Sequence, residues 1–583
     1  MTDEARDGGD RTENQIGVLG SPNTLDVFKM DVLGGYMPEP LYGKLLKFNH
    51  EEAKEGTTVN LKVMCQVASM ENRNIWHEQI GMRSLIKIKG RLENLSGDAD
   101  LKNCVLTYLG SYHEAAEKEG WEADNIGTPP RSGEPVKFVS QEDIDRATYL
   151  LGSDRWYMGM VPETNLRVPF SIKHFGPYNE GGAGEARMFG IFGQSGSGKS
   201  IIAAELIAGF ARHPDMGILI IDPQGEFHDN RLAKDTPFRF DFDELIALTM
   251  KTVHKKTISQ IQIEDDSELF VKLLRLRNVL QGLGYKGEEK QNELVDYLTS
   301  RLQEKIERRD WSLARLSFNE LCDLAFEGVR RIYTEGWRDQ IENKVNMART
   351  RRDLQEKFNA CRGFFEPQSP NGDPKERLAT LLERFLEGEL AIISLNVGTA
   401  EMSTEGKSLI VSEIVAGLIR EAATRYREER RINGLIVLDE AHRYAAQRME
   451  SEELPKISQD LRRLLENATR ETRKYSLGWL FITQSIVGFS KEIYRQLTDV
   501  WYGFGLTIGA DAENVKSRVG EEAYQMYAHF PNPKQTAKYL FLAYGGSVAL
   551  GTMGKPVVIE SISKFEDFLS FNGLLKPPPG PTG

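Results

Sequence analysis

Long hydrophobic runs are missing from this 583-residue sequence. No stretch approaches the roughly 18 apolar residues that a membrane-spanning helix needs, and the mean hydropathy of −0.43 excludes a membrane-embedded body. The first fourteen residues are polar and acidic, whereas a secretory signal begins basic and then becomes apolar. We therefore expect a cytoplasmic protein with no membrane partner.

Cysteine is scarce as well. The four cysteines, Cys65, Cys104, Cys322 and Cys361, lie far apart and form no C-x-x-C pair. Neither a disulfide framework nor a zinc ribbon is indicated by such spacing. We expect all four to be small buried hydrophobic side chains.

Positive charge is in deficit. The sequence has 74 Lys and Arg against 86 Asp and Glu, a formal net charge of −12. A protein that coats nucleic acid with its outer surface is basic. Either nucleic acid is not a partner, or the basic surface is local and enclosed.

The N-terminal part of the chain is predicted to be β-rich. Residues 1–14 lack periodicity, and we expect a disordered tail. Residues 15–175 are predicted to form a small β-barrel, because short alternating segments at 59–67, 84–92 and 105–109 are separated by glycine and proline turns.

The rest of the chain changes to alternating apolar strands and helices, which predicts an α/β fold with a parallel sheet covered on both faces. This core is expected over 176–240 and 388–560, and the charged, helix-patterned residues 241–387 look inserted into it. Residues 561–583, which end in a proline-rich stretch, are expected to be a C-terminal tail. Core strands are expected at 188–193, 218–222, 390–397, 434–440, 477–484 and 500–508.

A phosphate-binding loop follows the first core strand. Residues 193–200 read GQSGSGKS and match G-x-x-x-x-G-K-[ST] between an apolar strand and a helix. Glycines let backbone N–H groups point at phosphate oxygens; Lys199 is expected at the β- and γ-phosphates and Ser200 at Mg²⁺. The alternative is a glycine loop with a purely structural role. The predicted ATP-binding residues are Gly193, Gln194, Ser195, Gly196, Ser197, Gly198, Lys199, Ser200 and Ile201.

An acidic pair ends another apolar strand in GLIVLDEAHRY. Asp439 suits the group that holds Mg²⁺, and Glu440 suits the group that orients the attacking water. An ordinary helix cap is the alternative for this pair. Gln484, beside Thr483 in FITQ, is a candidate sensor of the γ-phosphate.

Two further segments are ambiguous on sequence alone. DPQGEF places Asp222, Gln224, Gly225 and Glu226 at a strand end, but it is also an ordinary turn signal. ATRETRKYSLG offers Arg470, Arg473 and Lys474 as cations for a neighbouring nucleotide, although basic residues are common at helix C-termini because of the helix dipole.

In this order, the segments GQSGSGKS, ILIIDPQGEF, GLIVLDEAHRY, RETRKYSLG and FITQS resemble the HerA family of hexameric DNA translocases, within the HerA/FtsK group of P-loop motors. The resemblance implies a RecA-like core, an N-terminal β-barrel and a helical subdomain. It also implies ATP and Mg²⁺ as cofactors, a homo-hexamer, and duplex DNA in a central pore. Family partners are nucleases, typically NurA-like, or sirtuin-like and other effectors of anti-phage defence, docked on the barrel face.

The resemblance also assigns roles to individual residues. Lys199, Ser200, Asp439, Glu440 and Gln484 match the Walker A, Walker B and sensor positions. Arg187, before the P-loop strand, and Arg473 match arginines that the family places at the neighbouring subunit's nucleotide.

The sequence does not decide the roles of several basic residues. Arg443 and Arg448 could contact DNA phosphates in a pore or pair with Glu450, Glu452 or Glu453. The basic groups His254, Lys255, Lys256, Arg349, Arg351 and Arg352 are expected on solvated faces.

The leading hypothesis is an ATP-driven duplex-DNA translocase or helicase that works with a nuclease or effector. An ATP-switched ring scaffold and a type IV secretion-like ATPase are the alternatives. A ring that encloses DNA needs basic residues only along its channel, so the acidic total does not exclude the motor.

Overall fold

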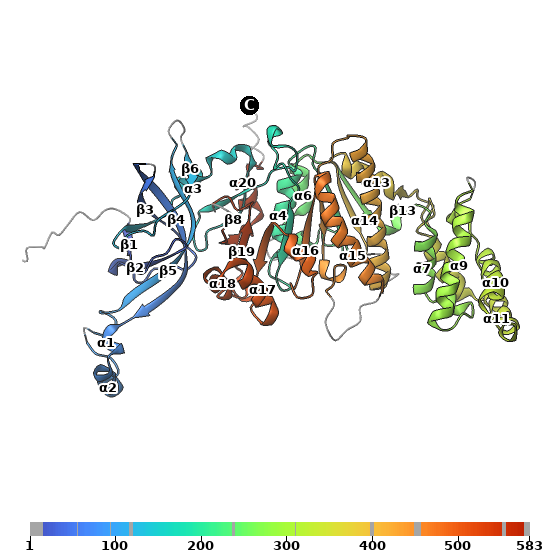
Figure 1. Cartoon of the computed structure of the whole chain (residues 1–583), viewed down its shortest axis with the longest axis horizontal. Coiled ribbons are helices and arrows are strands. Elements are labelled where there is room, and N and C mark those ends of the chain that lie inside the picture. The colour runs from blue at the N-terminus through green and yellow to red at the C-terminus, as the bar shows by residue number, and fades with distance from the viewer. Residues whose placement is uncertain are drawn as a thin grey trace, which may run out of the picture.

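The computed structural model describes residues 15–575 except 55, 94, 116–119, 236–238, 309–310, 397–401, 448–455 and 551–554. A barrel, an α/β core and a helical insertion follow one another along the longest axis of the molecule (Figure 1). The predicted α/β class with an N-terminal barrel is confirmed. The tail expected at 1–14 and the proline-rich end from 576 lie outside the described residues.

Six strands close the N-terminal barrel. They run in the order β2-β1-β7-β3-β4-β5, a pairing between β2 and β5 closes the circle, and β6 adds to the outer side of β5. Its interior holds buried apolar side chains such as Phe28, Leu61 and Val63. The strands are β1 (Gln15–Leu19), β2 (Val27–Val32), β3 (Leu45–Lys54), β4 (Thr57–Arg73), β5 (Leu101–Glu114), β6 (Trp121–Asp124) and β7 (Pro135–Phe138).

Most of the segment 84–92, expected as an alternating strand, is helical in the structure. It belongs to α2 (Ile80–Lys89), which follows α1 (Ile75–Glu78) at the end of the β4–β5 hairpin. The N–H of Gly90 bonds to the Ile86 carbonyl and ends the helix. The prediction was wrong because α2 buries no residue, so no core face dictates the spacing of its apolar side chains.

The barrel is also shorter than expected. Strands β8 (Arg155–Met160) and β9 (Arg167–Ser171), which fall within the range 15–175, pair with each other, and β8 pairs with β20 of the core sheet. Their apolar residues join the hydrophobic cluster under the P-loop helix. The closed barrel therefore ends with β7, and the short helix α3 (Gln141–Ala147) leads into the core.

The core sheet has eleven described strands in the order β12-β15-β11-β16-β17-β10-β18-β19-β20-β8-β9. Pairings from β12 to β18 are parallel and those from β18 to β9 are antiparallel. The remaining bounds are β10 (Met188–Phe192), β11 (Gly217–Asp222), β12 (Val253–Thr257), β15 (Leu390–Ser394), β16 (Gly434–Leu438), β17 (Leu477–Thr483), β18 (Asp499–Gly503), β19 (Leu540–Gly545) and β20 (Val557–Ser561).

Helices cover both faces of this sheet. Along β11, Ile218 and Ile220 pack in one hydrophobic cluster and Leu219 and Ile221 in another, as the two-residue strand period requires. The first cluster includes α4 (Lys199–Ala211), α6 (Phe242–Leu248) and α20 (Phe565–Phe571). The second includes α13 (Leu378–Leu386), α14 (Thr404–Arg427), α15 (Lys456–Glu471), α16 (Lys491–Gln496), α17 (Gly509–Val519) and α18 (Glu521–Ala528).

The expected insertion 241–387 is mostly helical. Its outer part consists of α7 (Ser267–Leu276), α8 (Val279–Gly282), α9 (Glu288–Ile306), α10 (Phe318–Ile332), α11 (Glu335–Ala348) and α12 (Arg352–Arg362). Its ends belong to the core, because β12 extends the parallel sheet and α13 packs on β11 and β15. A short ladder of β13 (Ile261–Gln262) and β14 (Glu376–Arg377) joins the two parts.

The range expected as a C-terminal tail, 561–583, also contains core structure. Helix α20 buries Phe568, whose ring lies 5.5 Å from the ring of Trp156. The expectation was wrong for this segment because Phe565, Phe568 and Leu569 form a helical apolar face that covers β8. All four cysteines are buried and free, as expected. In the part of the chain that the structure describes, no helix is long and apolar enough to cross a membrane.

The barrel is fixed to the core by buried polar contacts. The Gln66 side chain on β4 donates to the Val558 carbonyl at 2.9 Å and accepts from the Val558 N–H at 2.8 Å. Tyr112 on β5 donates to the Leu550 carbonyl at 2.7 Å. Gln66 thus makes the kind of hydrogen bonds to β20 that a neighbouring strand would make.

Candidate nucleotide site

Four neighbouring parallel strands bring the predicted polar groups to one edge of the sheet. Strands β11, β16, β17 and β10 lie side by side in that order. Parallel strands end at the same edge, where open α/β sheets bind ligands. The P-loop follows β10, Asp222 ends β11, Asp439 and Glu440 follow β16, and Gln484 follows β17.

The P-loop has the backbone shape that a phosphate cradle requires. Gly196 and Gly198 have φ of +83° and +89°, a region open to glycine at little cost. Helix α4 begins at Lys199, so its positive end faces the loop. Lys199 Nζ donates to the Gln194 carbonyl at 3.1 Å. Burial lowers the pKa of Lys199, and the opposing influence comes chiefly from Glu440, then Asp439 and Glu226.

Two amides hold the Glu440 carboxylate. Oε1 accepts from Gln224 Nε2 at 3.0 Å and from Gln484 Nε2 at 3.1 Å. The backbone of Glu440 is left-handed, with φ +49°, a strained conformation that is often found at functional sites. His442 Nδ1 lies 3.3 Å from Oε2. The two amides therefore fix the direction of the carboxylate, and Arg443, whose Nε lies 3.9 Å from Oε2, is the cation paired with it.

Asp439, Ser200 and Glu226 form the acidic side of the site. Asp439 is buried, and its Oδ2 has no hydrogen-bond partner among the described residues. Burial raises its pKa well above the ordinary value, and the carboxylates of Glu226, Asp222 and Glu440 add to this. Burial also raises the pKa of Glu226, against a hydrogen bond from the Ser200 side chain that lowers it.

This donor set fits Mg²⁺ held together with a nucleotide. An orphaned buried carboxylate oxygen, a hydroxyl and a second carboxylate are hard oxygen ligands of the kind that Mg²⁺ prefers. Within the described residues, no group of three or more His, Cys, Asp or Glu side chains could hold a metal ion. Phosphate oxygens and water must supply the remaining ligands, as in other P-loop sites.

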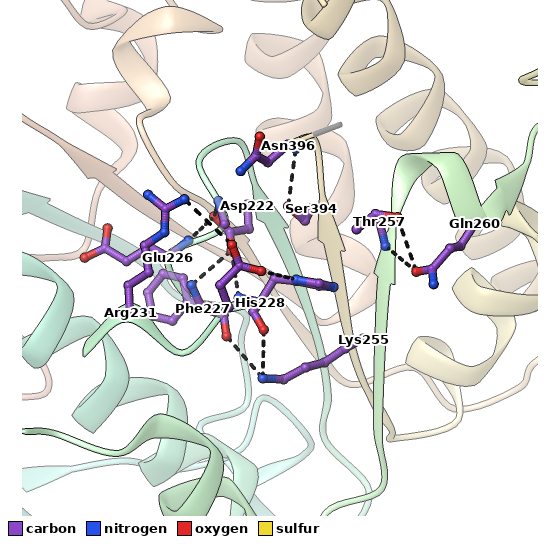
Figure 2. Close-up of polar contacts among 12 residues, drawn as sticks. Asp222, Glu226, Phe227, His228, Arg231, Lys255, Thr257, Gln260, Ser394 and Asn396 are labelled. Carbon is purple, nitrogen blue, oxygen red and sulfur yellow. Dashed lines mark hydrogen bonds and ion pairs between the residues drawn. The ribbon is translucent and has the colours of Figure 1, made fainter. Parts of the chain in front are cut away.

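Asp222 shapes the loop that carries Gln224 and Glu226. Its carboxylate accepts four backbone N–H bonds, from residues 225–228, at 2.8 to 3.0 Å (Figure 2). Lys255 on β12 donates to the Phe227 and His228 carbonyls from the other side. Asp222 thus builds the turn that DPQGEF predicts, and this turn places Gln224 against Glu440 and Glu226 against Ser200.

Two residues beside the P-loop were not expected from the sequence. Lys534 and Tyr539 lie against two glycines of the P-loop. A Cβ placed on Gly196 would lie 2.8 Å from Lys534 Cε and 3.8 Å from its Nζ, and a Cβ placed on Gly198 would lie 2.7 Å from the Tyr539 ring. Lys534 lies in the short helix α19 (Pro533–Thr536), which Asn532 caps. The one available signal was the helix start Asn-Pro-Lys, which says nothing about the P-loop.

Arg187 and Arg473 lie at the opposite edge of the sheet. Arg187 precedes β10 and Arg473 lies shortly before β17, whereas the P-loop and Gln484 follow these strands. A five-residue strand separates the edges by about 16 Å. Arg473 forms an ion pair with Glu185, and both side chains are about half exposed. Neither arginine therefore faces the nucleotide edge of its own chain.

The sequence did not decide the roles of several basic side chains. In the structure, most of these side chains form ion pairs with carboxylates. Arg443 Nε lies 3.9 Å from Glu440 Oε2. Arg448 and the glutamates 450, 452 and 453 lie outside the described residues. The others pair as follows: His254 with Glu389, Lys255 with Asp243, Lys256 with Glu376, Arg349 with Asp323, Arg351 with Asp353 and Arg352 with Glu356.

Comparison with known families gives one match. Residues 186–418 match the model of the helicase HerA central domain. This range begins just before β10 and includes the P-loop, the DPQGEF turn and the inserted helices. No curated protein matches the sequence significantly.

The solved structures that align with this chain are remote in sequence and have low TM-scores. VirB4 of Thermoanaerobacter pseudethanolicus aligns over 70% of this chain and 96% of its own, with 14% identity and a TM-score of 0.37. The genome packaging NTPase B204 from Sulfolobus turreted icosahedral virus 2, solved with ATP-gammaS, covers 64% and 98%, with 8% identity and a TM-score of 0.27. The pCW3 conjugation coupling protein TcpA covers 90% and 93%, with 8% identity and a TM-score of 0.26.

Proposed function

We propose that this chain is an ATP-hydrolysing motor of the HerA type that moves duplex DNA through a homo-hexameric ring, since residues 186–418 match the helicase HerA central domain. The observation that carries the proposal is the Glu440 carboxylate, held by Gln224 and Gln484 at the edge of the sheet where the P-loop lies. A carboxylate with a fixed direction beside a phosphate cradle is what hydrolysis of a nucleotide requires.

Each site residue then has a distinct task. Lys199 and the backbone N–H groups of the P-loop hold the phosphates, while Ser200 and Asp439 would hold Mg²⁺. When bound, Mg²⁺ neutralises charge that develops on the phosphate oxygens. Glu440 orients the attacking water and accepts its proton. Gln484 and Gln224 keep the acceptor oxygen pointed at that water.

The positions of two arginines support a ring. Phosphoryl transfer needs a cation against the developing charge, and a neighbouring subunit often supplies it. Arg187 and Arg473 are too far from the P-loop of their own chain to do so, since the full length of a strand lies between. In a ring, the amino edge of one sheet would face the nucleotide of the next subunit, and Arg473 would exchange Glu185 for a phosphate.

Duplex DNA is proposed as the substrate because the matched family model is that of a helicase. The net charge of −12 then belongs on the outside of the ring, where DNA does not pass. A nuclease or effector docked on the barrel face would act on the DNA that the motor delivers, in end processing or anti-phage defence within the cytoplasm. The alternative is a ring that uses ATP binding to switch an effector without moving DNA.

The proposal is tested by ATP hydrolysis with and without duplex DNA. We expect duplex DNA to raise the rate several-fold, and the Glu440→Gln variant to assemble, bind ATP and show no turnover. A rate that is the same with and without DNA would favour the switched scaffold. Full effector activity in a complex containing Glu440→Gln would contradict the motor.

A further inference from the structure

The end of the β4–β5 hairpin carries two helices that bury nothing. Helices α1 and α2, here called the hairpin knob, contain no buried residue. Figure 1 shows them at the tip of the hairpin, away from the barrel and the core. An isolated ten-residue helix has only marginal stability in water, and in proteins most of its stability comes from the packing of an apolar face. The knob therefore lacks the contact surface that would normally stabilise such a helix.

The apolar side chains of the knob face solvent. Ile80 is 86% exposed and Ile88 is 81% exposed. Residues 80, 84 and 88 lie along one helical row, so both isoleucines are on the same side of α2, with Leu85 next to them. Ile75 and Trp76 of α1 are also exposed. Exposed apolar side chains gathered this closely at one hairpin end favour a contact site over ordinary surface.

The knob is nevertheless held in a defined position. Asn74 caps α1 by accepting from the N–H groups of Trp76 and His77. The same side chain donates to the Leu95 carbonyl at 2.7 Å and to Asp100 at 2.6 Å. His77 contacts Ser96 at 2.7 Å. These bonds tie α1 to the segment 95–100, which leads into β5.

The hairpin also keeps the knob off its own barrel. From Met70 to Arg73 every residue of β4 is exposed. Four residues of strand span about 13 Å. A surface that covers the knob is therefore expected to come from outside its own barrel.

Charge indicates what that acceptor is. The knob and the segment after it, 75–97, contain four Lys or Arg against two Glu, a net of +2, whereas the rest of the barrel, 15–74 and 98–139, contains ten Lys or Arg against fifteen Asp or Glu, a net of −5. Opposite charges favour contact between a knob and a barrel of a second copy. The proposed ring would bring such barrels together.

From this exposure, anchoring and charge we infer that the hairpin knob of one subunit docks on the barrel of a neighbouring copy of this chain. The inference rests on the proposed ring. It assigns the knob to assembly, separately from the nucleotide site at the carboxyl edge of the core sheet.

Assembly of the full chain tests the inference. Ile80→Gln, Leu85→Gln and Ile88→Gln are combined in one variant, because glutamine suits a helix but not an apolar contact. We expect at least about a tenfold rise in the protein concentration needed for assembly, as for loss of interface anchors. Leu150→Gln with Met250→Gln is the matched control, since both side chains are exposed outside the knob. Light scattering gives the mass, and binding of a fluorescent ATP analogue verifies the fold.

A second measurement locates the acceptor. A photo-crosslinker at position 88 is placed in unlabelled protein that is mixed with isotope-labelled protein. We expect crosslinks between unlabelled knobs and labelled barrel peptides from 15–74 and 98–139. Normal assembly of the triple variant, or crosslinks to a different part of the chain, would overturn the inference and leave the motor intact. A wild-type protein that stays monomeric with ATP would overturn both.

Discussion

The amide of Gln484 donates to the carboxylate of Glu440, with Nε2 3.1 Å from Oε1. This contact joins the ends of two neighbouring strands, β17 and β16, and directs the carboxylate that we propose acts on water. Gln484→Ala should reduce turnover by about tenfold or more, because general bases contribute about 10² to 10⁴ in rate and depend on their orientation. ATP affinity should stay near the wild-type value.

Glu440→Gln is the companion variant, and it should abolish turnover with ATP binding intact. Single-turnover hydrolysis and nucleotide binding separate these effects. If Gln484→Ala weakened binding and left the rate at saturation unchanged, the amide would be a ligand of the nucleotide rather than a positioning residue.

Arg473 should act on the neighbouring subunit's nucleotide. Arg473→Ala should bind ATP normally and lose about 10³ or more in turnover. Mixing Arg473→Ala with Glu440→Gln subunits should restore activity, because some interfaces then combine an intact Glu440 with an intact Arg473. Each variant alone is the control. A mixture as inactive as its parts would place Arg473 outside the reaction.

Lys534 should contact the phosphates in addition to Lys199. Its Cε lies 2.8 Å from the place of a Cβ on Gly196, whereas Lys538, four residues on, is paired with Glu163. Lys534→Ala should raise the Kd for ATP by about tenfold, the value of one charge-assisted hydrogen bond, and affect AMP less. Lys538→Ala is the matched control. Equal effects of the two variants on ATP would remove Lys534 from the site.

Glu205 should make the stability of the P-loop helix depend on pH. It is fully buried in α4, and neither carboxylate oxygen has a hydrogen-bond partner among the described residues. Burial raises its pKa well above the ordinary 4.5. The folded state thus keeps a proton that the unfolded state releases, so stability falls as pH rises above about 4.5, by up to about 1.4 kcal/mol per pH unit.

Glu205→Gln removes this dependence while keeping the shape of the side chain. Its melting temperature relative to wild type should rise between pH 5 and pH 8, as measured by calorimetry. A difference that is constant over this range would show that the Glu205 proton is not retained on folding.

The nucleotide site could largely be located from the sequence because its parts are local motifs. GQSGSGKS, the pair Asp439–Glu440 and FITQ each end an apolar strand, and the sheet order makes these strand ends neighbours. The role of Asp222 could not be separated from its turn signal, because the same carboxylate bonds that form the turn also position Gln224 and Glu226. Lys534 could not be foreseen, since its approach to Gly196 depends on tertiary folding alone.

Secondary structure was harder to predict where a segment does not pack against the core, because no buried face then fixes the spacing of its apolar residues. Residues 84–92 were expected to form a strand, but residues 84–89 belong to α2, which has no buried residue. The strand expected at 500–508 ends at Gly503, because the chain then turns at Gly505, whose missing Cβ leaves room for Gln194. The sequence of helix α20 has apolar residues at helical spacing. This pattern was overlooked because the helix lies near the end of the chain.

Displacement of a triplex-forming strand from duplex DNA tests the central claim most directly, because it reports movement along the duplex. The assembled wild-type protein with ATP and Mg²⁺ should displace the third strand, and Glu440→Gln should bind ATP and leave the strand in place. Hydrolysis of ATP by the wild-type protein with no displacement of the third strand would contradict a motor that moves duplex DNA.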